Sequence, residues 1–143
     1  MKPTRRTVMA FDFGLSRIGV ATGNCLIGTT TPLPVLRAKD GVPQWKALED
    51  LVKEWQPDLL VVGEPLNMDG SPSDLSVRAE KFARRLHGRL GVEVVMVDER
   101  LSSFEAKSTS REQGHNGDFR RRPVDSVAAE LILKTWLAEN AAR

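Results

Sequence analysis

Carboxylates at three separate places in the chain could together carry metal-dependent chemistry. Asp12 closes a short apolar run and is followed by a glycine turn and a second apolar segment. Asp98 and Glu99 close a later apolar run, and Asp125 stands near the start of the last apolar segment. A carboxylate at the end of a buried strand costs free energy unless a partner offsets its burial, and a divalent cation is one such partner. Carboxylates that hold such cations can support phosphodiester hydrolysis.

The side chains available favour a hard cation at such a site. Oxygen-only ligands favour Mg²⁺ or Mn²⁺ over zinc. The chain has two histidines, His87 and His115, and one cysteine, Cys25, so a zinc site is not expected. Two ions about 3.5–4 Å apart can activate water and stabilise the leaving oxygen. Mg²⁺ or Mn²⁺ is therefore the expected cofactor.

Each of these acids also has an explanation without a metal. Asp12 could accept hydrogen bonds from backbone N–H groups in the turn at Gly14. Residues 98–100 could form a salt-bridge cluster at a strand end, and Asp125 could favour the positive end of a helix dipole. For Glu64, which ends another apolar run, exposure to solvent is the simpler expectation. The residues alone leave these alternatives open.

Basic residues accompany the acids along the chain. Such cations could neutralise phosphates that approach a group of carboxylates, and a solvated basic loop is the alternative. Aromatic residues make up 6% of the chain and there is no tyrosine, so contact with a nucleic-acid backbone is expected rather than extensive base stacking. The candidate nucleic-acid-binding residues are Arg17, Arg100, Lys107, Arg111, Arg120, Arg121 and Arg122.

The apolar pattern predicts one mixed α/β domain over residues 1–143. Three early strands with short turns indicate an antiparallel meander, and the third is expected to be irregular or at an edge because it contains Pro32 and Pro34. Helices and strands then alternate, with no repeat or linker. The predicted strands cover residues 7–13, 17–23, about 28–36, 58–63 and 92–97, and the predicted helices cover residues 45–55, 74–86, about 103–113 and a last segment that begins at Pro123.

This order of elements resembles that of the ribonuclease H-like fold, an α/β fold. It implies a mixed sheet in which an antiparallel three-strand meander is followed by parallel strands, with helices on both faces. In that fold, acids from strand ends and from a late helix meet at one point. The carboxyl ends of parallel strands gather ligand sites. We therefore expect Asp12, a later strand-end acid and Asp125 to lie close together.

Composition sets the class of protein. The chain has 143 residues, of which 41% are hydrophobic and 28% charged, as in an ordinary soluble domain. A single cysteine rules out an internal disulfide and fits a reducing cytosol. No segment approaches the roughly 20 apolar residues that span a bilayer, so a cytoplasmic protein with no membrane partner is expected. The net charge of +2 does not by itself indicate nucleic-acid binding.

Four sequence blocks, taken in order, resemble the YqgF/RuvX family of ribonuclease H-like nucleases, which are relatives of the RuvC Holliday junction resolvases. The resemblance runs from Asp12 to about Leu137. It implies a hydrolase that trims the 5′ end of pre-16S rRNA in the pre-ribosome during ribosome biogenesis. The resolvase assignment is the older inference from fold kinship. The blocks are Asp-Phe-Gly at 12–14 with Arg-Ile-Gly-Val-Ala at 17–21, Val-Val-Gly-Glu-Pro-Leu-Asn-Met-Asp-Gly at 61–70, Asp-Glu-Arg-Leu-Ser-Ser at 98–103 with Glu-Ala at 105–106, and Val-Asp-Ser-Val-Ala-Ala at 124–129.

The resemblance implies a catalytic and metal-binding set of Asp12, Glu99 and Asp125. Asp12 matches the first-strand ligand and Asp125 matches the late-helix acid. Asp98 and Glu99 both occupy the strand-end motif, and strand alternation would point them in opposite directions, so one direct ligand is expected. Glu99 is favoured, with Asp98 as the alternative. Glu64 departs from the family pattern, which more often has an apolar residue there.

Three functions stay open on the sequence. The leading one is a Mg²⁺- or Mn²⁺-dependent nuclease that acts on RNA as a monomer or weak homodimer. The second is an endonuclease that resolves branched DNA at the same site, for which a dimer is needed because two strands must be cut symmetrically. The third is a non-catalytic, nucleic-acid-binding factor in ribosome assembly.

Overall fold

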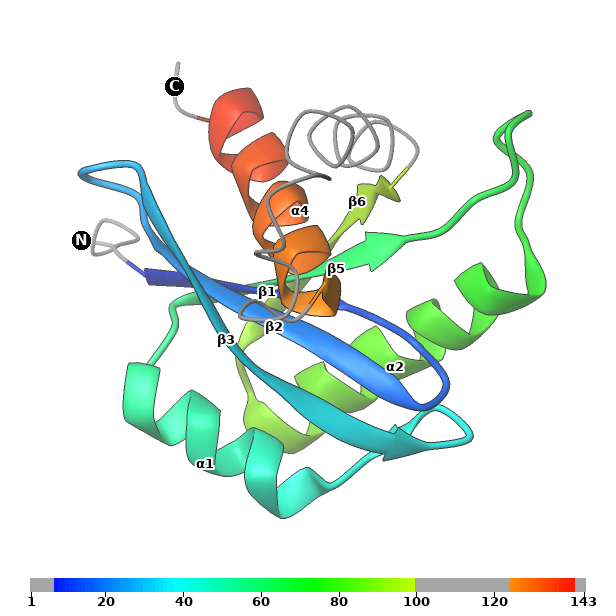
Figure 1. Cartoon of the computed structure of the whole chain (residues 1–143), viewed down its shortest axis with the longest axis horizontal. Coiled ribbons are helices and arrows are strands. Elements are labelled where there is room, and N and C mark those ends of the chain that lie inside the picture. Colours follow the sequence, from blue (N-terminus) through cyan, green and yellow to red (C-terminus); the bar gives the residue numbers. More distant parts are fainter. Residues whose placement is uncertain (1–6, 100–123, 141–143) are drawn as a thin grey trace.

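The computed structural model of the chain describes residues 7–99 and 124–140, without the side chains of residues 124–126. Figure 1 shows the path of the chain through these elements. The helix expected over residues 103–113 lies outside the described residues, as does the basic loop that follows it. The elements are β1 (Thr7–Asp12), β2 (Arg17–Asn24), β3 (Thr29–Lys39), β4 (Val42–Pro43), α1 (Trp45–Trp55), β5 (Leu59–Glu64), α2 (Asp74–Leu90), β6 (Glu93–Asp98) and α4 (Val124–Asn140).

The described strands form one sheet in the order β4-β3-β2-β1-β5-β6. β1, β2 and β3 pair antiparallel, whereas β5 pairs parallel to β1 and β6 pairs parallel to β5. This arrangement confirms the predicted meander followed by parallel strands. Because parallel strands end at the same edge of a sheet, the last residues of β1, β5 and β6 come to one edge. These residues are Asp12, Glu64 and Asp98.

The third strand is longer than predicted and forms a hairpin that the sequence analysis missed. β3 continues to Lys39 and pairs with the two-residue strand β4. Asp40 and Gly41 connect them with φ angles of 50° and 82°. Positive φ at both positions is typical of a two-residue hairpin turn, for which Asp-Gly is a favoured sequence. Pro34 lies where the register between β2 and β3 shifts, in agreement with the expected irregularity.

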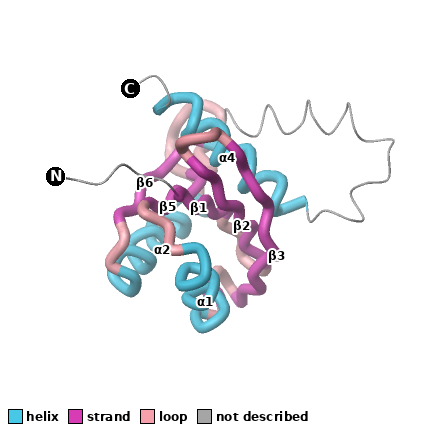
Figure 2. The backbone as a smooth tube through the Cα atoms, turned by 90° about the vertical axis from the view of Figure 1, so that its left-hand side faces the viewer, coloured by secondary structure: helices cyan, strands magenta, loops and turns pink. Residues whose placement is uncertain are grey.

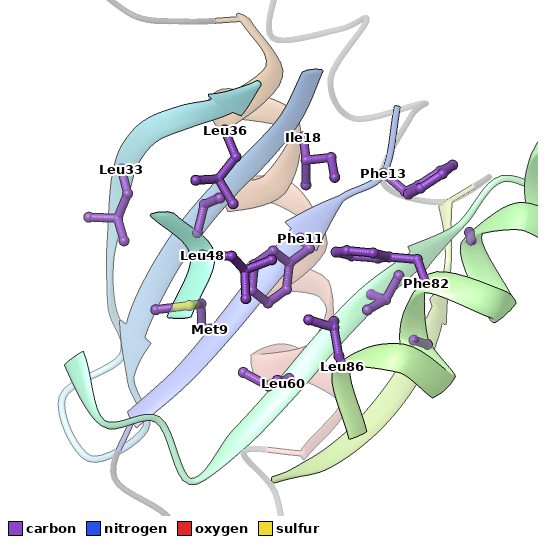
Figure 3. Close-up of a cluster of buried hydrophobic side chains, with 14 residues drawn as sticks. Met9, Phe11, Phe13, Ile18, Leu33, Leu36, Leu48, Leu60, Phe82 and Leu86 are labelled. Carbon is purple, nitrogen blue, oxygen red and sulfur yellow. The ribbon is translucent and has the colours of Figure 1, made fainter. Parts of the chain in front are cut away.

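Helices cover both faces of the sheet, as predicted (Figure 2). Alternate residues of β1 point to opposite faces. Met9 and Phe11 belong to the buried cluster with α1 and α2, which Figure 3 shows in close-up. Val8 and Ala10 belong to the cluster with α4. The two faces of the sheet therefore carry different helices, and the face on which a strand-end side chain lies decides its neighbours.

Local signals set the ends of the helices. Ser73 caps α2, where its hydroxyl accepts a hydrogen bond from the backbone N–H of Ser76 at 2.9 Å. α2 then runs to Leu90, beyond the predicted end at residue 86, and stops at Gly91 with φ of 69°. α1 ends at Trp55, with Gln56 as its C-cap before Pro57, as predicted. Among the described residues, none of the helices combines the length and apolar character that a bilayer crossing requires.

Candidate functional site

Asp12 and Glu99 meet on the face of the sheet that α4 covers. Asp12 is the last residue of β1, and strand alternation places it on the same side as Val8 and Ala10. Glu99 directly follows β6, two strands away in the sheet. The two carboxyl groups share a hydrogen bond. The structure thus brings together two of the three acids that the sequence resemblance selected.

Gly63, on the strand between them, leaves the space that Glu99 occupies. A Cβ atom at this position would lie 2.6 Å from Oε1 and 2.7 Å from Cγ of Glu99. It would also lie 2.6 Å from Cδ1 of Ile132 in α4. Such separations are too short for non-bonded atoms, so the missing side chain lets Glu99 cross β5 toward Asp12. Gly63 belongs to the second of the four sequence blocks, but no role was expected for it.

Burial and the like charge of the two groups determine the protonation of the Asp12–Glu99 pair. Burial, the hydrogen bond with Asp12 and the charge of Asp12 raise the pKa of Glu99 to about 9, with a smaller contribution from Asp98. Two carboxylates this close cannot both ionise easily, and one of them keeps a proton unless a cation enters. The pair is therefore suited to hold either a proton or a metal ion.

A second acidic group lies on the opposite face of the same edge. Glu64 and Asp98 are paired residues of β5 and β6, and Glu64 shares a hydrogen bond with Glu80 of α2. Burial, the charge of Glu80, this hydrogen bond and the charge of Asp98 raise the pKa of Glu64, which is partly exposed. The adjacent residues of the strand-end motif thus have different surroundings: Glu99 shares a hydrogen bond with Asp12, whereas Asp98 is paired in the sheet with Glu64 and adds charge beside it.

The other candidate residues are described in part. Asp125 is the second residue of α4, and its side chain is outside the described part of the structure. Arg17 is exposed at the start of β2, in the same hairpin as Asp12. Within residues 7–99 and 127–140, no three His, Cys, Asp or Glu side chains are grouped to hold a metal ion. Outside the described residues lie Arg100, Lys107, Arg111, Arg120, Arg121 and Arg122.

Solved structures with the same fold include Holliday junction resolvases. The chain is similar to Thermus thermophilus RuvC in complex with a Holliday junction substrate, with a TM-score of 0.56, 15% identity, and coverage of 95% of this chain and 97% of that chain. It is also similar to the fowlpox virus Holliday junction resolvase, with a TM-score of 0.57, 12% identity, and coverage of 93% and 99%. At this level of identity the likeness concerns the fold, which is ribonuclease H-like as expected.

Other proteins share far more sequence identity with this chain than these solved structures do. A protein of Azotobacter vinelandii named "Putative pre-16S rRNA nuclease" is 56% identical over 137 residues, which cover 96% of each chain. A protein of Hahella chejuensis with the same name is 54% identical over 135 residues, which cover 94% of this chain and 85% of the relative. The profile of the RuvX family, which is described as Holliday junction resolvase, matches residues 6–139. The chain therefore belongs to the RuvX family, and the predicted membership is confirmed.

Proposed function

We propose that this chain is a divalent-metal-dependent nuclease that processes the 5′ end of pre-16S rRNA in the cytoplasm. The observation that carries the proposal is the hydrogen-bonded pair of Asp12 and Glu99 at the carboxyl edge of the parallel strands. The names of the relatives that are more than half identical support the substrate. We treat residues 1–143 as one domain, because the described helices all pack on a single sheet, and we propose that it works as a monomer or weak homodimer.

The donor set fits Mg²⁺ or Mn²⁺. Asp12 and Glu99 offer oxygen atoms only, which suit these hard cations. The raised pKa of Glu99 arises from burial and from its carboxylate neighbour, and a cation held by the two carboxylates would offset that penalty. When bound, the metal would polarise the scissile phosphate and lower the pKa of the attacking water. Asp12 and Glu99 would hold that metal at the carboxyl edge of the parallel strands, on the α4 face.

Asp125 is the proposed third ligand. It stands seven residues before Ile132 in α4, and seven residues are close to two turns of an α-helix. The two positions therefore share one side of the helix. Ile132 packs over Gly63, beside Glu99. Asp98 remains the alternative to Glu99, but the hydrogen bond between Glu99 and Asp12 favours Glu99.

A cleavage assay tests the proposal. Purified protein would be given a pre-16S rRNA 5′ leader, an unstructured RNA and a four-way DNA junction, each with Mg²⁺, Mn²⁺ or EDTA. We expect cleavage of the leader with metal, and a loss of roughly 100-fold or more for Asp12→Asn and for Glu99→Gln, because even residues that only support a metal ligand contribute 10–100-fold. Glu80→Gln is the matched control, since it changes an acid on the other face of the sheet.

The same assay distinguishes the two other functions. The family description and the shared fold favour junction resolution as the second candidate. It would appear as paired cuts in the DNA junction by a dimer, with the RNA left intact. A non-catalytic assembly factor would cleave none of the substrates, and Asp12→Asn would then support normal 16S rRNA maturation in cells. Cleavage that persists in EDTA would contradict the metal site itself.

A further inference from the structure

We propose that a basic groove between α2 and the β3–β4 hairpin binds the phosphodiester backbone of the RNA substrate outside the cleavage site. This inference rests on the proposed function and adds a second contact surface to it. The groove has a volume of about 440 Å³. The residues from α2 that line it are mainly cationic, and its floor is apolar.

The groove lies on the α1/α2 face of the sheet, at the edge where β1 ends. Phe13 lines it and directly follows Asp12 in the chain. The turn after β1 is held against the hairpin by two backbone hydrogen bonds: the N–H of Gly41 donates to the carbonyl of Leu15 at 2.8 Å, and the N–H of Ala38 donates to that of Ser16 at 2.9 Å. The groove thus lies on the face of the sheet opposite to Asp12 and Glu99, and an RNA strand would reach it by passing around this turn.

The charge of the groove suits a polyanion. Arg78, Lys81, Arg84 and Arg85 line it from α2, and all four are exposed. Its one lining carboxylate, Asp40, is paired with Arg78 at 3.0 Å. Among the described residues the other three exposed cations have no ion-pair partner, and phosphate groups are the nucleic-acid component that such cations bind.

The floor of the groove favours backbone contacts over base stacking. Phe13 and Phe82 pack against each other with ring centroids 5.4 Å apart, and they are only 5% and 3% exposed. Figure 3 shows the two rings side by side among the buried residues. The guanidinium of Arg89 covers Trp45, 4.3 Å from its ring centroid. Little free aromatic surface is left for a base to stack on, so binding should depend little on sequence.

Acidic residues mark the other flank of α2. Glu80 shares a hydrogen bond with Glu64, and Asp98 contributes charge to the same group. A phosphate backbone would be repelled from this flank and attracted to the hairpin flank. The distribution of charge on α2 therefore restricts the RNA to one path, along the groove.

The test is the salt dependence of RNA binding. Binding of a fluorescent pre-16S 5′ leader would be measured in EDTA over a range of NaCl concentrations, for the wild type and for the triple variant Lys81→Gln/Arg84→Gln/Arg85→Gln. Each lost contact to single-stranded RNA lowers the slope of log K against log salt by about 0.7, so three contacts lower it by about 2. At 0.15 M salt this corresponds to a loss of affinity on the order of 10- to 50-fold.

A matched control removes the same charge elsewhere. Lys46→Gln/Lys53→Gln/Lys134→Gln changes exposed lysines of α1 and α4 and should leave the slope unchanged. Both triple variants should keep the melting temperature of the wild type, because all six side chains are exposed. Equal effects of the two variants would show that net charge, and not the groove, governs binding.

The outcomes separate this inference from the proposed function. A groove variant with unaltered slope and affinity overturns the inference even where metal-dependent cleavage is intact. A wild type that binds the RNA with a groove-dependent slope but cleaves nothing supports the groove and contradicts the nuclease. Absence of RNA binding by the wild type, or groove-dependent binding of the DNA junction alone, overturns the RNA-binding groove.

Discussion

Substitution of Gly63 by alanine should disable the site while leaving the fold in place. The change adds one methyl group at the point where the Glu99 side chain crosses β5 to reach Asp12. That methyl carbon would lie 2.6 Å from Oε1 of Glu99 and 2.6 Å from Cδ1 of Ile132. The φ angle of Gly63 is not in the left-handed region, so the backbone itself tolerates alanine. The effect is therefore purely one of space.

The magnitude follows from these contacts. Relief of two such contacts requires shifts on the order of 1 Å, since ordinary carbon contacts lie near 3.5–4.0 Å. Overpacking of this kind costs about 1–3 kcal/mol of folding free energy. Glu99 is more easily moved than α4, because it needs only a change of rotamer. A displacement of about 1 Å at a catalytic group costs about 100-fold in rate.

The assay compares cleavage rate and unfolding free energy in parallel. Gly88→Ala is the control: Gly88 lies inside α2, and a Cβ there would meet nothing within 4 Å. This variant should gain about 0.5–1 kcal/mol of stability through helix propensity and keep full activity. Gly63→Ala should lose both stability and activity.

A double variant separates the two contacts. Ile132→Val removes the Cδ1 atom that the new methyl group would strike, so Gly63→Ala/Ile132→Val should recover part of the lost stability. Activity should stay low, because Glu99 is still displaced. A Gly63→Ala protein with wild-type cleavage rate would refute the reasoning that Glu99 acts from its position over Gly63.

Two further predictions concern pH and capping. Without metal, the raised pKa of Glu99 means that the folded state holds one more proton than the unfolded state between about pH 4.5 and pH 9. The stabilisation that this protonated carboxyl group gives is complete below about pH 4.5 and is lost as the pH rises toward about 9. Glu99→Gln should therefore be more stable than the wild type in EDTA by about 1–3 kcal/mol near pH 8, with the difference vanishing near pH 4 in urea titrations. Ser73→Ala removes the acceptor for the Ser76 N–H and should cost about 1 kcal/mol, which thermal unfolding can measure, and Ser73→Thr should restore most of it.

Much of the fold could be predicted because local pattern and tertiary structure agree. The apolar runs of β1 and β5 are buried on both faces, and their ends are marked by charged residues. The strand β4 was missed because it has only two residues, which are too few to show the alternation of apolar and polar residues that predicts a strand. Its signal was the Asp40-Gly41 pair, a favoured sequence for a two-residue hairpin turn. The end of α2 was placed too early, since a polar last turn continues to Gly91.

The residues of the candidate site could be predicted from the sequence, but the way in which they are brought together could not. Alternation along a strand was enough to expect that Asp98 and Glu99 point to opposite faces. The place where the side chain of Glu99 goes depends on the neighbouring strand, and no local pattern indicates that Gly63 makes room for it. The basic groove was also missed. Its cations lie on a helix that was predicted, but the hairpin that faces them was not.

The position of β6 at the edge of the described sheet has a consequence for how the protein loses activity on heating. Among described strands it pairs with β5 alone, and Val97 is its one buried residue, whereas four or five consecutive residues are buried in β1 and β5. Segments with few buried contacts open at lower free energy than the core. Glu99 is attached to the end of this strand, so partial opening of β6 would withdraw it from Asp12 while the meander stays folded. Inactivation should therefore precede global melting, with amide exchange in β6 rising first.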